Sequence, residues 1–147
     1  MSPRMRLDVS VNLLTMHALS KGKITVFGGD QVRPNIHIDD ITDVYLHLID
    51  NSQHTGIFNA GFENISIMDI AKTVTKYIPV EIEVTESTDP RSYRLNSDKL
   101  VATGFSPRKK IENAIMELID AYNQGHLKDE DRFHNLRWME SNNFNRT

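Results

Sequence analysis

Three arginines in two short segments are the residues of this chain best suited to bind an anion. Arg33 lies in GGDQVRP, between a Gly-Gly pair and a proline, and Arg91 and Arg94 lie in DPRSYR. A planar guanidinium group donates paired hydrogen bonds that match the oxygens of a phosphate. The structural alternative is two solvated surface arginines, with the third in a salt bridge with Asp39 or Asp40. The residue pattern alone favours this commoner arrangement.

A second candidate is the segment IHIDD, in which His37 and Asp39 lie two positions apart. On an extended segment this spacing places both side chains on one face, where they could bind a metal or act as a base. No third ligand follows at metal-binding spacing, and His-x-Asp pairs are common. We therefore interpret Asp39 as a helix cap and His37 as a packed or hydrogen-bonded histidine, and we expect no metal site.

Motifs that would carry catalysis or hold a cofactor are absent from these 147 residues. There is no G-x-G-x-x-G, no Walker lysine loop, no G-x-S-x-G elbow and no H-E-x-x-H. The pair Gly28-Gly29 leads to Arg33-Pro34 and not to a helix, so it does not present helix N-terminal amides to a phosphate. We assign no catalytic, cofactor-binding or metal-binding residue within the chain.

Helices and short strands alternate along the sequence, which indicates an α/β fold with α+β character. Apolar residues at helical spacing predict helices over 7–19, 40–49, 67–78, 98–102 and 111–122. Short apolar or alternating runs predict strands over 24–27, 57–61 and 80–84, with 33–38 extended. Phe133, Leu136 and Trp138 are expected to dock the polar tail onto the body. We therefore expect four or five helices and a few short strands, and these strands would make a poor sheet on their own.

Composition excludes several classes of partner. The net charge is −3, with 17 Lys and Arg against 20 Asp and Glu, and the basic residues are scattered. Nucleic acid and acidic membranes both require a concentrated basic face, so neither is expected. The chain has no cysteine and no apolar run of membrane-spanning length, from which we expect a cytoplasmic protein.

Four stretches follow one another in a familiar order: SPRMRLDVSVN, ITVFGGDQVRPNIHIDDITDVY, GIFNAGFENISIMDIAKTV and DPRSYRLNSDKLVATGFSP, then a closing helix. This order resembles the C-terminal part of the NAD-dependent epimerase/dehydratase family, the extended short-chain dehydrogenases that act on nucleotide sugars. The likeness runs from about Ser2 to about Trp138. It implies that residues 1–147 are a single C-terminal substrate-binding portion that lacks the main Rossmann sheet. Within it, residues 38–61 resemble the helix and strand that return to the NAD-binding domain.

The resemblance also implies a site. Arg33 occupies the place of the family's arginine that reaches the pyrophosphate of a nucleotide sugar. Its side chain is then expected in a cleft shared with Ile24–Phe27, where Val26 and Phe27 lie along the nucleobase. Asn12 matches a position where relatives contact the substrate.

One departure from the family pattern concerns the second phosphate contact. Many relatives have Arg-Pro-Gly where this chain has Glu86-Ser87-Thr88. Arg91, five residues further on, is the candidate replacement. Arg94 is expected to pair with a carboxylate.

In the family, the glycine-rich NAD loop and the catalytic Tyr-x-x-x-Lys precede the point where this chain begins, and none of its four tyrosines has a lysine four residues on. The resemblance therefore implies that NAD belongs to the intact enzyme and that this chain is inactive alone.

The implied partners are a nucleotide-diphosphate sugar, and either the NAD-binding domain of the same enzyme or a second copy. A non-catalytic nucleotide-sugar-binding module and an oligomerisation module remain as alternatives. The strand Ile57–Ala60 and the apolar stripe of the helix before it should lack part of their cover.

Overall fold

The computed structural model describes residues 5–87, 89 and 91–142. The helices are α1 (Ser10–Lys21), α2 (Ile38–Asp50), α3 (Ile67–Tyr77), α4 (Asp98–Val101), α5 (Ile111–Asn123) and α6 (Asn135–Ser141), with a 3-10 turn η1 (Asp131–Phe133). The strands are β1 (Lys23–Phe27), β2 (Val32–Asn35), β3 (Glu63–Ser66) and β4 (Glu81–Thr85). The mixed α/β character is confirmed. The described part has six α-helices where four or five were expected, because the tail adds α6.

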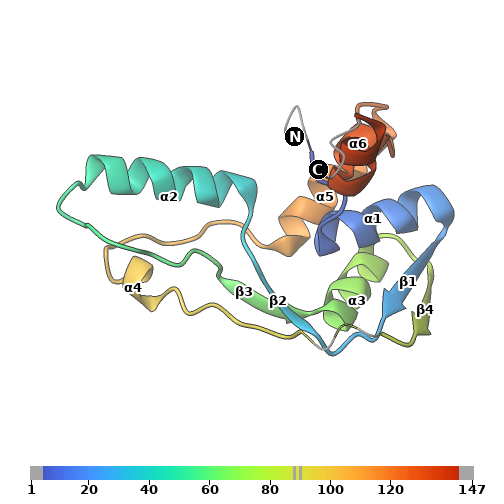
Figure 1. Cartoon of the computed structure of the whole chain (residues 1–147), viewed down its shortest axis with the longest axis horizontal. Coiled ribbons are helices and arrows are strands. Elements are labelled where there is room, and N and C mark those ends of the chain that lie inside the picture. Colours follow the sequence, from blue (N-terminus) through green and yellow to red (C-terminus); the bar gives the residue numbers. More distant parts are fainter. Residues whose placement is uncertain (1–4, 88, 90, 143–147) are drawn as a thin grey trace.

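The four strands form two separate two-stranded sheets. β1 pairs with β4 in parallel, with Ile24 opposite Ile82, and β2 pairs with β3 in antiparallel register, with Arg33 opposite Ile65. In Figure 1, β1 and β4 lie beside α1 and α3, whereas α2 extends as an arm toward the opposite end of the molecule. The β2–β3 ribbon runs between these two regions.

The main core lies where α1, α3 and α5 pack against β1. Its buried side chains are Val11, Leu14, Ala18, Ile24, Val26, Ile70, Ala71, Val74, Ile111 and Ile115. The first helix begins at Ser10 and not at residue 7, since Val9 is extended with φ −99° and ψ 148°. Leu7 is nonetheless fully buried, in a second cluster that includes Phe133. Phe133 thus docks the tail as expected, whereas Leu136 is 69% exposed and does not.

The segment predicted as a strand over 57–61 forms no ladder in the structure, and that prediction is wrong. Side chains of the facing segment satisfy its backbone instead: Lys99 Nζ donates to the carbonyl oxygen of Ile57 at 2.9 Å, and the amide of Gly61 donates to Ser97 Oγ at 3.0 Å. The strand comes later, as β3, where Asn35 and Glu63 begin the pairing with β2.

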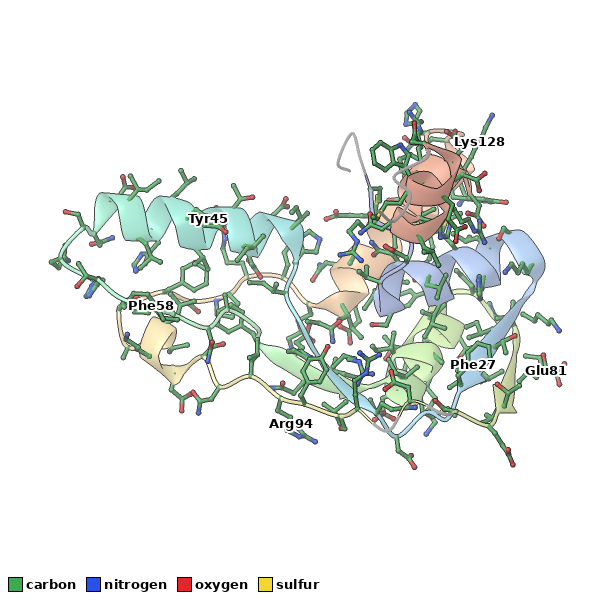
Figure 2. The ribbon with its side chains drawn as sticks, in the orientation of Figure 1. Phe27, Tyr45, Phe58, Glu81, Arg94 and Lys128 are labelled. Carbon is green, nitrogen blue, oxygen red and sulfur yellow. The ribbon has the colours of Figure 1, made fainter. Side chains whose placement is uncertain are left out.

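The α2 arm carries an exposed apolar face. Val44 faces a small core with Leu100 and Phe105, but other apolar side chains of the arm stay open to solvent. These are Ile38, Tyr45, Leu46 and Ile49, which are 54–70% exposed, and Ile57 in the segment after α2 is 87% exposed. Figure 2 labels Tyr45 on this arm and Phe58 on the strand-like segment beneath it. Among the described residues, no helix has the length and apolar character needed to cross a membrane.

Candidate anion-binding site

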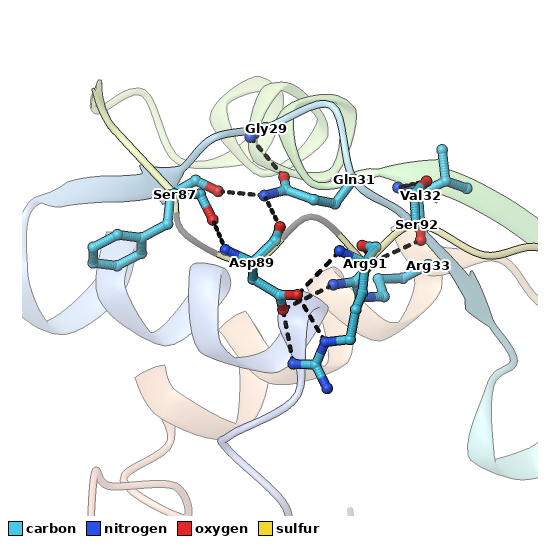
Figure 3. Close-up of polar contacts among 9 residues, drawn as sticks. Gly29, Gln31, Val32, Arg33, Ser87, Asp89, Arg91 and Ser92 are labelled. Atoms are coloured by element: carbon cyan, nitrogen blue, oxygen red, sulfur yellow. Dashed lines mark hydrogen bonds and ion pairs between the residues drawn. The ribbon is translucent and has the colours of Figure 1, made fainter.

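The turn between β1 and β2 is tied to the segment 87–93 by one side-chain amide. Gln31 Oε1 accepts from the backbone amide of Gly29 at 2.8 Å, and Gln31 Nε2 donates to the carbonyl oxygens of Phe27 and Asp89 at 3.2 and 3.3 Å. Figure 3 shows this network between the two segments. Gly28 and Gly29 have φ angles of 76° and 120°, a region that favours glycine, so the turn can bring its backbone close to Gln31.

Arg33 projects from β2 toward the same segment. Its Nη1 donates to the carbonyl oxygens of Val32 and Arg91 at 3.0 and 2.6 Å, and its Nη2 lies 3.5 Å from Asp89 Oδ2. The guanidinium carbon lies 5.0 Å from the ring centroid of Tyr93, a cation–π distance. The Arg33 side chain is 20% exposed. Arg33 is therefore held in one orientation by the segment that covers it.

Arg91 reaches the same carboxylate from the solvent side. Its Nε donates to Asp89 Oδ1 at 2.7 Å and its Nη2 donates to Asp89 Oδ2 at 2.8 Å, the paired geometry of a fork. The hydrogen bonds from the Arg91 side chain and backbone amide lower the pKa of Asp89 to about 2. The side chain of Arg91 is 77% exposed. Two guanidinium groups from distant segments thus converge on one ionised carboxylate (Figure 3).

This arrangement differs from the structural alternative, in which one of the three arginines pairs with Asp39 or Asp40, because Arg33 and Arg91 both meet Asp89. Asp40 instead accepts from the backbone amides of Arg108 and Lys109, both at 3.0 Å. It also corrects the expectation for Arg94. No carboxylate of the described residues lies within ion-pair distance of Arg94, which Figure 2 shows at the outer edge of the molecule.

Residues 92–95, which follow Arg91, are hydrogen-bonded along the β2–β3 ribbon. Val32 of β2 makes two of these bonds: its carbonyl oxygen accepts from the amide of Tyr93 at 3.3 Å, and its amide donates to Ser92 Oγ at 3.0 Å. The Asn64 amide of β3 pairs with both backbone groups of Leu95, at 2.9 and 3.0 Å. These contacts fix the place at which Asp89 and Arg91 meet Arg33.

The remaining residues expected at the site are dispersed. Phe27 is 62% exposed and lies at the rim of the Gln31 network. Val26 is fully buried, so only its backbone could face a ligand. Among the described residues, the polar contacts of Arg33 go to residues 32, 89 and 91. The cleft that Arg33 was expected to share with Ile24–Phe27 stays a prediction.

Asn12 lies elsewhere. Its Nδ2 donates to the carbonyl oxygen of Arg6 at 2.7 Å, and its side chain lines a cavity of about 560 Å³ together with His37 and Glu117. Neither Arg33 nor Arg91 lines that cavity. The structure therefore brings Arg33 and Arg91 together, links Phe27 to them only through the Gln31 network, and leaves Asn12 in a cavity that neither arginine lines.

The His37 cluster is an ion-pair network at the start of α2. His37, and not Asp39, is the N-cap: its Nδ1 accepts from the amide of Asp39 at 3.2 Å. Lys109 Nζ lies 2.6 Å from an oxygen of both Asp39 and Glu117, and its hydrogen bond lowers the pKa of Asp39. Ligand-type atoms of His37, Asp39 and Glu117 lie within 4.8 Å of one another. The Lys109 ammonium is already paired with an oxygen of each carboxylate, so the geometry favours an ion-pair network over a metal centre.

Two residues of the site were missed by sequence reasoning. Asp89 is the acceptor that joins the arginines, and Gln31 is the amide that joins the two segments. The Asp-Pro-Arg spacing was a signal for Asp89, because residues two apart around a proline turn can pair locally. Gln31 has no sequence signal, since its partners are backbone atoms.

The fold is shared with solved structures of sugar-nucleotide enzymes, although no family model matches the chain. A dTDP-glucose 4,6-dehydratase from Bacillus anthracis, in complex with NAD, aligns over 90% of this chain with a TM-score of 0.70 and 19% identity. A UDP-glucuronic acid 4-epimerase from Bacillus cereus, in complex with a UDP-sugar analogue and NAD, aligns over 83% with a TM-score of 0.70 and 22% identity. A UDP-glucose 4-epimerase from Thermotoga maritima, with UDP-glucose, aligns over 80% with a TM-score of 0.66 and 19% identity. The chain spans only 40–43% of the length of these three proteins.

Proposed function

We propose that this chain is the substrate-binding portion of an NAD-dependent nucleotide-sugar epimerase or dehydratase, in which Arg33 and Arg91 hold the diphosphate. The observation that carries the proposal is the convergence of two guanidinium groups from segments 58 residues apart at one anionic group. That convergence occurs within a fold shared with enzymes of this kind. An arginine pair around an anion is an arrangement suited to a diphosphate.

The two arginines are suited to different tasks. Arg33 is fixed by two carbonyl oxygens and by the Tyr93 ring, so it offers a preorganised charge that loses little freedom on binding. Arg91 is exposed and can follow the ligand. Phe27, exposed at the rim, offers a ring against which a nucleobase can lie.

The chemistry of such an enzyme is supplied by NAD, which takes a hydride from the sugar and returns it. In the proposal the NAD loop and the catalytic tyrosine and lysine lie outside this chain, whose own part is to bind the substrate and set substrate choice. The purified 147-residue chain is then expected to give no turnover of UDP-, GDP- or dTDP-sugars.

Residues 38–61 are proposed to dock on the NAD-binding domain. Their exposed apolar side chains include Tyr45, Ile49 and Ile57, a patch of the kind that recruits a partner. Ile57 lies in a segment without a ladder partner, and its carbonyl oxygen accepts from the Lys99 side chain, so a strand of the partner would pair here in place of that lysine. The same face supports the second candidate function, self-association as an oligomerisation module.

The test is calorimetric titration of the chain with UDP, GDP and dTDP. Arg33→Ala should weaken diphosphate binding by ~1.5–3 kcal/mol, or roughly 10- to 150-fold, the range for a charged hydrogen-bond partner. Arg132→Ala is the matched control, because Arg132 also lies over an aromatic ring, 4.6 Å from the Phe133 centroid, and pairs with Glu130. Equal affinities of the two variants would remove Arg33 from the site and leave the oligomerisation function.

A further inference from the structure

The carboxylate of Asp89 accepts the hydrogen bonds that a bound diphosphate would need from Arg91 and Arg33. Asp89 Oδ1 accepts from the backbone amide and the Nε of Arg91, at 3.1 and 2.7 Å. Asp89 Oδ2 accepts from Nη2 of Arg91 at 2.8 Å and lies 3.5 Å from Nη2 of Arg33. The edge of Arg91 formed by Nε and Nη2, which matches two phosphate oxygens, is therefore taken by Asp89 (Figure 3).

We propose that Asp89 is a built-in competitor of the diphosphate: its carboxylate holds both arginines in the free protein and is displaced when the ligand binds. This inference rests on the proposed function, because it concerns the same two arginines. It adds a residue that opposes binding and that sets how many negative charges a ligand must carry.

The Asp89 side chain can leave while its backbone stays in place. The Asp89 amide donates to Ser87 Oγ at 3.1 Å and its carbonyl oxygen accepts from Gln31 Nε2 at 3.3 Å, so the main chain is held on both sides. The carboxylate itself is held by an exposed ion pair between residues two apart, a class of interaction that contributes little net stability. Its distance to Arg33, 3.5 Å, is at the long end for a hydrogen bond. Rotation of one side chain therefore frees both arginines.

The exchange selects ligands by charge. A ligand with one negative charge only replaces the charge of Asp89, so it gains little from the two arginines. A diphosphate carries at least two negative charges over several oxygens and can engage Arg33 and Arg91 together. Asp89 thus favours a ligand with two or more negative charges over a singly charged one.

The opposite role for Asp89 predicts the opposite sign. If the carboxylate positioned Arg33 and Arg91 for the ligand, its removal would release Arg91 and weaken binding. Arg33, however, keeps its two carbonyl acceptors and its ring contact without Asp89. The loss of the carboxylate should therefore leave Arg33 in place and increase the net positive charge of the site.

The experiment measures the affinity of the full chain for inorganic pyrophosphate and for inorganic phosphate by calorimetry, for wild type, Asp89→Asn, Arg33→Ala and the control Glu130→Gln. Glu130 also pairs with an arginine two residues away, Arg132, at 2.7 Å, in a tail segment outside this network. Asp89→Asn should tighten pyrophosphate binding about five- to tenfold and reduce the preference for pyrophosphate over phosphate, and Glu130→Gln should change neither. Circular dichroism melting checks each fold, and Asp89→Ser replaces the asparagine variant if the latter unfolds.

The possible results separate the two proposals. Tighter binding by Asp89→Asn, or binding by this variant with none by wild type, supports the competitor role. Equal or weaker binding by Asp89→Asn overturns that role, and the proposed function still stands if Arg33→Ala weakens binding. Failure of every variant to bind pyrophosphate, at concentrations that saturate an arginine-pair site, overturns both proposals.

Discussion

The replacement Gly28→Ala tests whether the turn before Arg33 is shaped by its glycine. Gly28 has a φ of 76°, and a Cβ at this position would lie 2.6 Å from Gln31 Nε2 and 3.0 Å from Ser87 Cβ. Real Cβ atoms do not approach this closely, so the Gln31 amide must move. Gly125 is the matched control, because its φ is 73° and a Cβ there meets nothing within 4 Å.

The expected loss in the free energy of unfolding follows from the hydrogen bonds that the Gln31 side chain would lose. Both variants carry the cost of a left-handed backbone for an L-residue, roughly 1–2 kcal/mol. Only Gly28→Ala also displaces the amide that bonds Gly29, Phe27 and Asp89. Each such hydrogen bond contributes about 0.5–1.5 kcal/mol net, and water replaces part of that. We therefore expect Gly28→Ala to lower the free energy of unfolding by ~1–2 kcal/mol more than Gly125→Ala does.

Urea unfolding monitored by circular dichroism gives both free energies, provided the slopes agree with wild type. The same pair of glycine variants in a Gln31→Ala background forms a double-mutant cycle, in which the excess should vanish because the amide is already gone. Equal destabilisation by Gly28→Ala and Gly125→Ala would refute the reasoning. So would an excess that persists without Gln31.

Two further predictions concern the α2 arm. Wild type should self-associate at micromolar concentration in sedimentation velocity, and Tyr45→Lys with Ile49→Lys should make it monomeric, because those side chains are 66% and 70% exposed. Leu136→Lys, at an exposed leucine of α6 outside the arm, should leave the self-association unchanged, and a monomeric wild type would contradict the prediction. The hydrogen bond from Lys109 lowers the pKa of Asp39 below 3.8, so the stabilisation from this pair should be complete above that value and disappear as the pH falls through the lowered pKa. Lys109→Met should flatten this part of the stability profile in urea unfolding between roughly pH 6 and pH 2, and an unchanged profile would show that the pair contributes nothing.

The helices could be read from the sequence because their apolar residues share one face. In α3, the stripe that includes Ile70, Ala71 and Val74 is buried, and Ser66 caps the helix by accepting from the amide of Asp69 at 3.0 Å. The α2 stripe had the same period, yet Tyr45 and Ile49 are exposed. The periodicity indicates that one face of a helix is apolar. It does not show whether another part of this chain packs against that face.

Strand pairing was less accessible, because short strands have weak signals. The apolar run at 57–61 looked more like a strand than ENIS does, but ENIS forms β3. A polar contact supports the pairing: Asn35 Nδ2 donates across the ribbon to the carbonyl oxygen of Glu63 at 3.2 Å, and to that of Arg33 on its own strand at 2.9 Å. Such contacts depend on which segments meet in three dimensions.

The same reason explains why the arginines were identified individually and their meeting point was not. Arg33 and Arg91 could be nominated by residue type, but their distance depends on the path of residues 91–97. Asn64 fixes that path at Leu95, and Ser97 fixes it at Gly61, where Ser97 Oγ bonds both the amide and the carbonyl oxygen of Gly61, at 3.0 and 3.1 Å. Each anchor joins a side chain to backbone groups more than 30 residues away. The anion site is therefore a property of the ribbon that carries β2 and β3, and changes at Asn64 should disturb the arginine pair without touching it.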